Sequence, residues 1–320
     1  MHRFAGDGDG IVADTFQLDT HPYYCRYQAQ MPGTGEVYRN EAVAQTVDCA
    51  HVAVDRMILD NRGVSEHVVA GLKCLHRIAQ RKYEVAVLPI GATEAHNRHL
   101  PEGEDALDTT YIARRCCETA WQQCQSVICL PAIPYGVDCN LSRFPLSIHV
   151  AQSTLDALAR DIITSLHGHG IRKIVLVNGH GGNDFIPLVR QIQCDLPVHV
   201  FLCNWWMVAL DQYNAIFEAR DDHAGEFETS VALALHPELV ERDAAGSGHF
   251  RAFRFEALEK GWVRTSRDFA RLNDHCGVGD PSRATADKGH RYLDLTCERL
   301  SQFLIELAQT PIDETFPQVP

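Results

Sequence analysis

Three short stretches of the chain concentrate side chains that bind metals or transfer protons. Their histidines and carboxylates are Glu94, His96 and Asp105, then His180, and then His223, Glu226 and Glu228. Glu94 and His96 are two residues apart, so both point the same way in an extended segment. A mixture of imidazole and carboxylate ligands suits Zn²⁺, Mn²⁺ or Fe²⁺ better than Ca²⁺ or Mg²⁺. Such residues can hold two cations when one carboxylate bridges them, and this pair makes hydroxide from water and polarises a carbonyl.

Other interpretations of the same residues stay open at this point. Glu94, His96, His99 and Asp105 could belong to an acidic, solvated loop. The glycines around His180 could cradle a phosphate at a helix N-terminus, although the segment has neither a G-x-G-x-x-G nor a G-K-[ST] pattern. Glu226 and Glu228 are also favoured at the start of a helix by its dipole alone.

The surrounding pattern predicts the elements that must position these residues. Short apolar strands are expected at 84–91, 126–131, 172–177 and 197–203, and helices at 65–82, 111–123, 153–167, 185–193 and 231–235. This alternation predicts an α/β fold, a three-layer α/β/α sandwich with a mostly parallel central sheet. Functional residues then gather beyond the carboxyl ends of the strands. We expect one domain at 57–310, an irregular N-terminal extension at 1–56 and a C-terminal tail at 311–320.

Composition restricts the partners and the location. The chain has 320 residues, of which 45% are hydrophobic, and its net charge is −13. This acidity argues against nucleic acid and anionic membranes as partners, and no apolar run approaches the ~20 residues of a membrane span. The start lacks the apolar core of a secretion signal, and the twelve cysteines contain no C-x-x-C pair. We therefore expect a soluble, cytoplasmic protein with reduced thiols.

Taken together, the motifs resemble the creatininase (creatinine amidohydrolase) family over roughly residues 84–295. The resemblance rests on LPIGATEAHNRHLP at 88–101 with Asp105, VNGHGGN at 177–183 and HAGEFETS at 223–230. Weaker support comes from PAIPYG at 131–136 and GVGDPSRAT at 277–285. The family implies a hydrolase with two divalent metal ions (Zn, Mn or Fe) per chain, an α/β/α sandwich and a homo-oligomer, often a hexamer.

The resemblance also implies a role for each residue. Glu94 and His180 are expected to bind one metal, His96 the other, and Asp105 to bridge them. Creatininase itself has a further carboxylate where this chain has Gly182, and we expect Glu226 to replace it because a metal that loses a carboxylate ligand needs another. Two catalytic residues complete the prediction: His223 as a proton shuttle and Glu228 as a carboxylate that orients a ligand or caps the helix.

Departures from the family pattern bear on the substrate. Ala95, Asn97 and Arg98 replace the usual Gln, Gly and Pro, and Gly181-Gly182 replaces a Tyr-Glu, which argues against creatinine itself. We expect a metal-bridging hydroxide to cleave the C–N bond of a small non-peptide amide, such as a cyclic amide or a formamide. Arg98 would favour an anionic substrate if it faces the pocket, and it is otherwise a surface residue.

Two further questions are open from the sequence. Trp205 and Trp206 could wall the substrate pocket, or they could be core or interface aromatics. Two functions other than hydrolysis also remain. The chain could be a non-catalytic metal-binding scaffold on the same fold, or a nucleotide-binding α/β protein.

Overall fold

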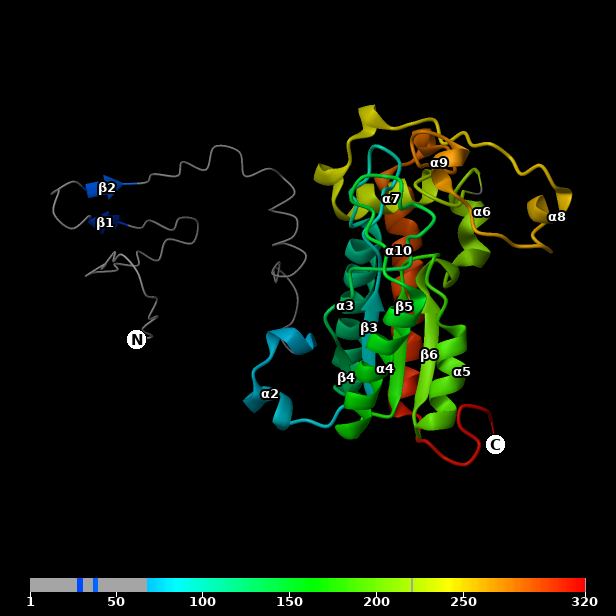
Figure 1. Cartoon of the computed structure of the whole chain (residues 1–320). Coiled ribbons are helices and arrows are strands. Elements are labelled where there is room, and N and C mark those ends of the chain that lie inside the picture. Colours follow the sequence, from blue (N-terminus) through cyan, green and yellow to red (C-terminus); the bar gives the residue numbers. More distant parts are fainter. Residues whose placement is uncertain (1–27, 31–36, 40–67, 220, 320) are drawn as a thin grey trace. The chain divides into compact units, whose positions relative to one another are not determined.

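The computed structural model describes residues 28–30, 37–39, 68–219 and 221–319 (Figure 1). The chain forms two units, Met1–Val54 and Asp55–Pro320. In the first, β1 (Gln28–Gln30) pairs antiparallel with β2 (Val37–Arg39). The expected boundary between an extension at 1–56 and the main domain lies outside the described residues and stays a prediction.

A four-stranded parallel sheet forms the centre of the second unit. Its order is β4 (Val127–Cys129), β3 (Val85–Ile90), β5 (Lys173–Asn178) and β6 (His199–Asn204). In register, Ile90 lies opposite Asn178, and Asn178 lies opposite Asn204. The three longer strands therefore end level with one another, and the segments that follow them share one edge of the sheet.

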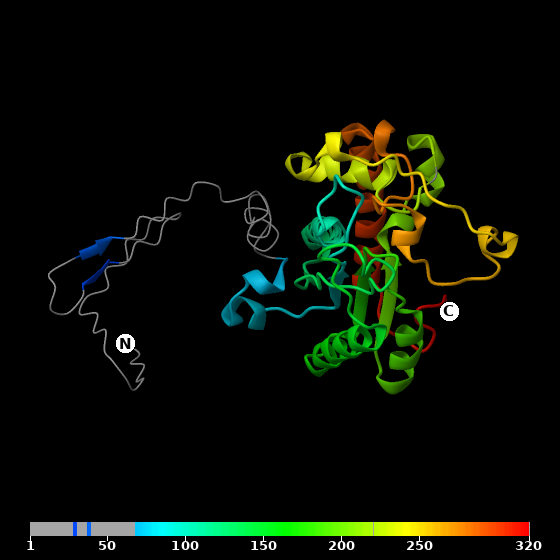
Figure 2. The same ribbon diagram turned by 45° about the horizontal axis from the view of Figure 1, so that its top comes forward.

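Helices cover both faces of this sheet. The long helices are α3 (Glu104–Cys124), α4 (Gln152–Gly168), α5 (Ile186–Asp195), α7 (Glu226–Leu235) and α10 (Ala286–Gln309). Helices α4 and α5 lie on one face, and α3 and α10 lie on the other (Figures 1 and 2). Residues of β3 and β5 are buried throughout because both faces are covered. The predicted three-layer α/β/α sandwich is confirmed.

The remaining elements are short. The helices are α2 (Leu75–Ala79), α6 (Tyr213–Ile216), α8 (Glu256–Glu259) and α9 (Phe269–Leu272). The 3₁₀ turns are η1 (Ala70–Leu72), η2 (Trp205–Met207), η3 (Leu210–Gln212), η4 (Pro237–Leu239), η5 (Arg242–Ala244) and η6 (Pro281–Arg283). None of the helices in the described ranges combines the length and the apolar character that a bilayer span requires.

The continuous helix predicted at 65–82 is wrong for the residues that the structure describes. Val68 and Val69 are buried at the edge of the sheet, where Val69 forms a parallel bridge to Cys129 and the Val68 carbonyl accepts the Cys129 amide. The helical spacing of these valines predicts a helix, but two β-branched residues are equally suited to an extended segment that pairs with the edge strand of a sheet. Only η1 and α2 follow, and Leu75 in α2 is 81% exposed.

Candidate metal centre

Close packing at the end of the sheet brings the first turn of α3 to the predicted ligands. A Cβ on Gly91, directly after β3, would lie 2.5 Å from backbone atoms of Ala106, and one on Gly179, after β5, would lie 1.7 Å from the Thr109 hydroxyl. The absence of side chains at both glycines lets α3 approach the strand ends. Helix α3 begins at Glu104 rather than near Tyr111, so Asp105 lies in its first turn.

Asp105 stands between the two histidines and faces each with a different oxygen. Its Oδ1 is 3.2 Å from His96 Nε2, and its Oδ2 is 3.0 Å from His180 Nδ1. Glu94 Oε1 lies 3.2 Å from His180 Nδ1 and 3.9 Å from His96 Nε2. All four side chains are buried. The structure therefore gathers Glu94, His96, Asp105 and His180, and we call these four residues the ligand cluster.

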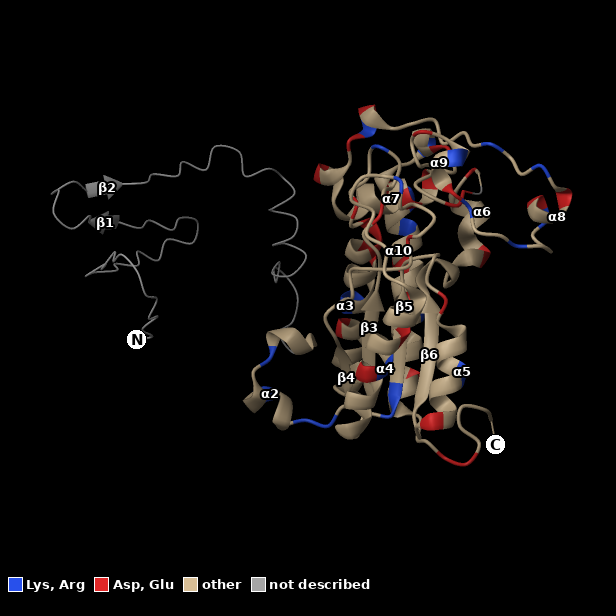
Figure 3. Ribbon diagram, in the orientation of Figure 1, with Lys and Arg blue, Asp and Glu red and all other residues tan. Residues whose placement is uncertain are grey.

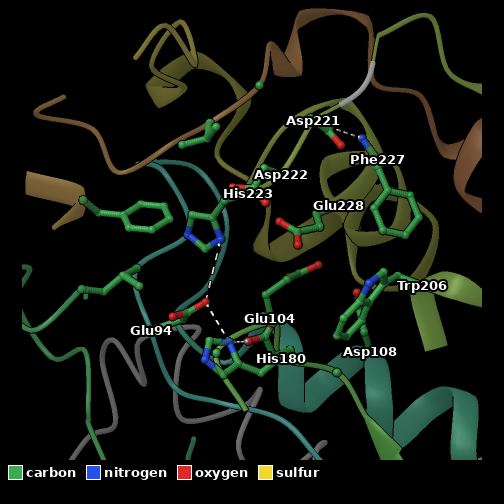
Figure 4. A pocket seen from close by; sticks show the side chains of 18 of the residues that line it. Glu94, Glu104, Asp108, His180, Trp206, Asp221, Asp222, His223, Phe227 and Glu228 are labelled. Atoms are coloured by element: carbon green, nitrogen blue, oxygen red, sulfur yellow. Dashed lines mark hydrogen bonds and ion pairs between the residues drawn. The ribbon is translucent and has the colours of Figure 1, made fainter. Parts of the chain in front are cut away.

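His223 and Glu228 approach the ligand cluster from the start of α7 (Figure 4). His223 Nε2 donates a hydrogen bond to the Ala95 carbonyl at 2.8 Å, and its Nδ1 is 3.8 Å from Glu94 Oε1. Glu228 offers a carboxylate oxygen that lies, with His96 and Asp105, in a group whose ligand atoms are within 4.8 Å of one another. Both residues predicted to be catalytic therefore face the cluster.

Glu226 does not join them, and the expectation that it replaces the missing ligand is corrected. Its carboxylate pairs with Lys288 of α10 and accepts the backbone amides of Glu218 and Ala219 at 2.9 and 3.3 Å. The physical reason is the helical period: residues two apart are about 200° apart around a helix axis. Of Glu226 and Glu228, only one can face the cluster, and it is Glu228.

One carboxylate near the cluster was not predicted from the sequence. Asp138 is fully buried in the irregular segment after β4, and its Oδ1 lies 2.8 Å from His180 Nε2. His180 Nε2 also lies 3.3 Å from the Val137 carbonyl, its hydrogen-bond acceptor, so a proton on Nε2 leaves the lone pair of Nδ1 for the cluster, and the Asp138 carboxylate favours that proton. A single aspartate outside any regular element carries no periodic signal, so only the fold reveals it.

Mutual charge effects dominate the titration of the cluster. Burial lowers the pKa of His96 and of His180, but the surrounding carboxylates outweigh it and raise both values well above the ordinary one. Burial raises the pKa of Asp105, yet His96 and His180 together hold it below its usual range. Burial also raises the pKa of Glu228 to about 8, whereas burial and His96 lower that of His223 to about 3. The pKa of each of these groups therefore depends on the charges of its neighbours in the cluster.

The donor set fits divalent cations. Oxygen Oε2 of Glu94 is buried and has no hydrogen-bond partner among the described residues. Such an oxygen is costly to bury unless something positive meets it. Imidazole nitrogens and carboxylate oxygens are the ligands of Zn²⁺ and its transition-metal neighbours, and the two oxygens of Asp105 point to two different positions.

The ligand cluster opens into a cavity of about 660 Å³. Trp206 lines it together with Trp205, which is buried and packs on Phe227 at a ring distance of 5.4 Å. Acidic residues gather around α7 beyond the sheet (Figure 3). Arg267 also lines the cavity, but it pairs with Asp222. This acidic wall disfavours a phosphate ligand at the Gly-His-Gly-Gly turn.

Arg98 lies elsewhere. It pairs with Asp274 at 3.0 Å, its side chain is half exposed, and it is not among the residues that line this cavity. The preference for an anionic substrate, which depended on Arg98 facing the pocket, therefore has no support.

Comparison with known proteins finds relatives of a single family. The family model described as creatininase (creatinine amidohydrolase) matches residues 75–304. Creatinine amidohydrolase of Pseudomonas putida is 31% identical over 180 residues, which are 50% of this chain and 67% of that protein. The mycofactocin precursor peptide peptidase of Mycobacterium ulcerans is 31% identical over 218 residues, covering 64% of this chain and 78% of that protein.

Solved structures share the fold. A provisional creatinine amidohydrolase from Bacteroides fragilis superimposes with a TM-score of 0.73 at 35% identity, over 78% of this chain and all of that one. A manganese creatininase gives a TM-score of 0.60 at 24% identity, over 76% of this chain and 99% of that one. The chain therefore belongs to the creatininase family of metal-dependent amidohydrolases.

Proposed function

We propose that this chain hydrolyses the C–N bond of a small non-peptide amide, such as a cyclic amide or a formamide, with two divalent cations in the ligand cluster. The observation that carries the proposal is the convergence of Glu94, His96, Asp105 and His180. They come from three separate segments, and their nitrogen and oxygen atoms lie 3.0–3.9 Å apart. The cations are Zn²⁺, Mn²⁺ or Fe²⁺, the ions that this donor set accepts.

The contacts suggest how the ligands divide. Glu94 and His180 would bind one cation and His96 the other, with one oxygen of Asp105 on each. Glu228 takes the place that the sequence had assigned to Glu226, because its carboxylate is within coordination reach of His96 and Asp105. Divalent cations held here would lower the pKa of water and polarise the carbonyl of the amide.

The proton that the leaving nitrogen needs can come from His223. Its Nε2–H is committed to the Ala95 carbonyl, so Nδ1 keeps a free lone pair on the side of Glu94. Burial and His96 lower the pKa of His223, so Nδ1 is unprotonated in the resting site and would take its proton from the water that attacks the amide. We assign to His223 the transfer of that proton to the leaving nitrogen.

A substrate panel tests the proposal. Purified chain loaded with Zn²⁺, Mn²⁺ or Fe²⁺ is incubated with cyclic amides, formamides, linear amides and short peptides, since some relatives are peptidases. We expect turnover of at least one non-peptide amide, its loss in Glu94→Gln, and a lowered kcat with nearly unchanged metal content in His223→Asn. Cleavage of peptides alone would contradict the non-peptide assignment, and metal-loaded chain without any turnover would favour a non-catalytic scaffold.

We also propose that the chain acts as a homo-oligomer, by family resemblance a hexamer, in the cytoplasm. Exposed aromatic residues flank α8, where Phe255 is 64% and Trp262 is 73% exposed, and burial against a second copy would remove this surface from water. The ten cysteines in the described ranges are free thiols, as in a reducing compartment. Light scattering should give a multiple of the 35.8 kDa chain mass. A monomer at micromolar concentration would contradict the oligomer.

A further inference from the structure

A second group of metal-binding side chains lies where α3 meets the end of α7. It consists of Glu104, Asp108 and His236, which we call the α3–α7 cluster. Glu104 and Asp108 are four residues apart on α3 and so share one helix face, and His236 directly follows the last residue of α7. His236 Nε2 is 3.0 Å from Glu104 Oε2 and 3.9 Å from Asp108 Oδ1.

Burial makes this group unlike an acidic surface patch. Glu104 is 1% exposed, Asp108 is 2% exposed and His236 is 8% exposed. Glu104 Oε1 and Asp108 Oδ1 have no hydrogen-bond partner among the described residues. A single imidazole therefore meets two buried carboxylates and leaves one oxygen of each unsatisfied, which is costly in a dry environment.

We propose that the α3–α7 cluster binds a divalent transition-metal ion, separate from the pair in the ligand cluster. One ligand atom from each residue lies within 4.8 Å of the others, a spread that a small shift closes around a common centre. One nitrogen and two carboxylate oxygens suit Zn²⁺ or Mn²⁺ and argue against Mg²⁺ or Ca²⁺, which prefer oxygen alone. Glu104 and Asp108 line the cavity, so an ion can reach them from solvent.

Such an ion would stabilise the arrangement of the catalytic site without touching the substrate. Helix α3 carries Asp105, one residue from Glu104, and α7 carries Glu228, eight residues before His236. A cation shared by the two helices would hold Asp105 and Glu228 at a constant separation. The ion would link α3 to the end of α7, the two helices that carry these site residues.

Metal counting on the full chain tests the site. Metal-free protein is dialysed against Zn²⁺ or Mn²⁺, and the bound ions are counted by mass spectrometry of the elements. We expect one ion fewer per chain in Asp108→Asn and in His236→Gln than in wild type, and no change in Glu118→Gln, an acidic position further along α3. Equal counts in wild type and both cluster variants would overturn the proposal.

A second measurement separates this site from the proposed function. The double variant Glu94→Gln/His180→Gln loses ligands of the catalytic pair but keeps the α3–α7 cluster. We expect it still to bind one ion, and Zn²⁺ to raise its melting temperature. Adding Asp108→Asn to this variant should abolish both effects. If the double variant binds no ion, the α3–α7 site is refuted whatever the substrate panel shows.

Discussion

Exchanging the two carboxylates at the start of α7, one at a time, distinguishes their roles. Glu228→Gln keeps the shape of the side chain but removes its charge from the group formed with His96 and Asp105. Loss of a carboxylate that binds or orients at a metal site weakens metal affinity by about 10- to 100-fold, or ~1.4–2.7 kcal/mol. We expect the weaker of the two cations to be lost on dialysis while the fold persists.

Glu226→Gln should behave in the opposite way. Its carboxylate is buried against Lys288, and the change leaves that ammonium with the Arg283 carbonyl at 3.0 Å and Glu218 at 3.4 Å. Because these partners remain, the loss is that of a charged hydrogen bond, about 1.5–3 kcal/mol of unfolding free energy, rather than the larger penalty of an isolated buried charge. Metal content should stay at the wild-type value.

Elemental analysis and denaturant unfolding of both variants provide the assay. The expected pattern is a crossed one: Glu228→Gln loses metal and activity, and Glu226→Gln loses stability. Loss of metal in Glu226→Gln, with full metal retention in Glu228→Gln, would refute the orientation of α7 on which the site depends.

Three other outcomes follow from the structure. In the metal-free protein, carboxylates raise the pKa of His96 and His180, so the protonated imidazoles stabilise the folded state. This contribution is fully present below the ordinary histidine pKa of about 6.5 and is lost as the pH rises through the raised pKa values of the folded protein. Unfolding free energy measured in EDTA should therefore fall above that pH, whereas with metal it should not, because the metal requires neutral imidazoles; a parallel rise in both would contradict this. Asp138→Asn should weaken metal binding about 10- to 100-fold through its effect on His180. Isothermal titration calorimetry measures this affinity, and a wild-type value would contradict the role of Asp138. Gly91→Ala should lower the free energy of unfolding by about 1–3 kcal/mol, because its Cβ would clash with backbone atoms of Ala106. A wild-type value in chemical denaturation would show that α3 can move away from β3 without loss of stability.

The gathering of the ligand cluster could be predicted because simple rules apply to it. Apolar runs between helices imply parallel strands, and parallel strands place the residues that follow them at one edge. Glu94, His96 and His180 follow β3 and β5 directly, so their convergence needs no detailed packing. The resemblance to the creatininase family adds only the bridging role of Asp105, whose position depends on the close packing of α3 against Gly91 and Gly179.

The residues that were misplaced or missed depend on long-range packing. Glu226 and Glu228 occupy one helix turn, and which of them faces the ligand cluster depends on the rotation of α7. Lys288, which receives Glu226, is 62 residues away in the sequence. The spacing of Val68 and Val69 is compatible with a helix and with an extended segment. Their pairing with Cys129, 60 residues further along the chain, is what makes them extended. Asp138 belongs to no pattern and becomes visible only beside His180.

The central claim is that the ligand cluster holds two cations, with Asp105 between them. Crystals of the full chain soaked in Mn²⁺ and measured for anomalous scattering test it directly. We expect two anomalous peaks within the ligand cluster, one beside Glu94 and His180 and one beside His96, each in contact with a different oxygen of Asp105, whether or not a further peak lies at the α3–α7 cluster. No more than one ion among these four side chains under saturating Mn²⁺ would contradict the claim.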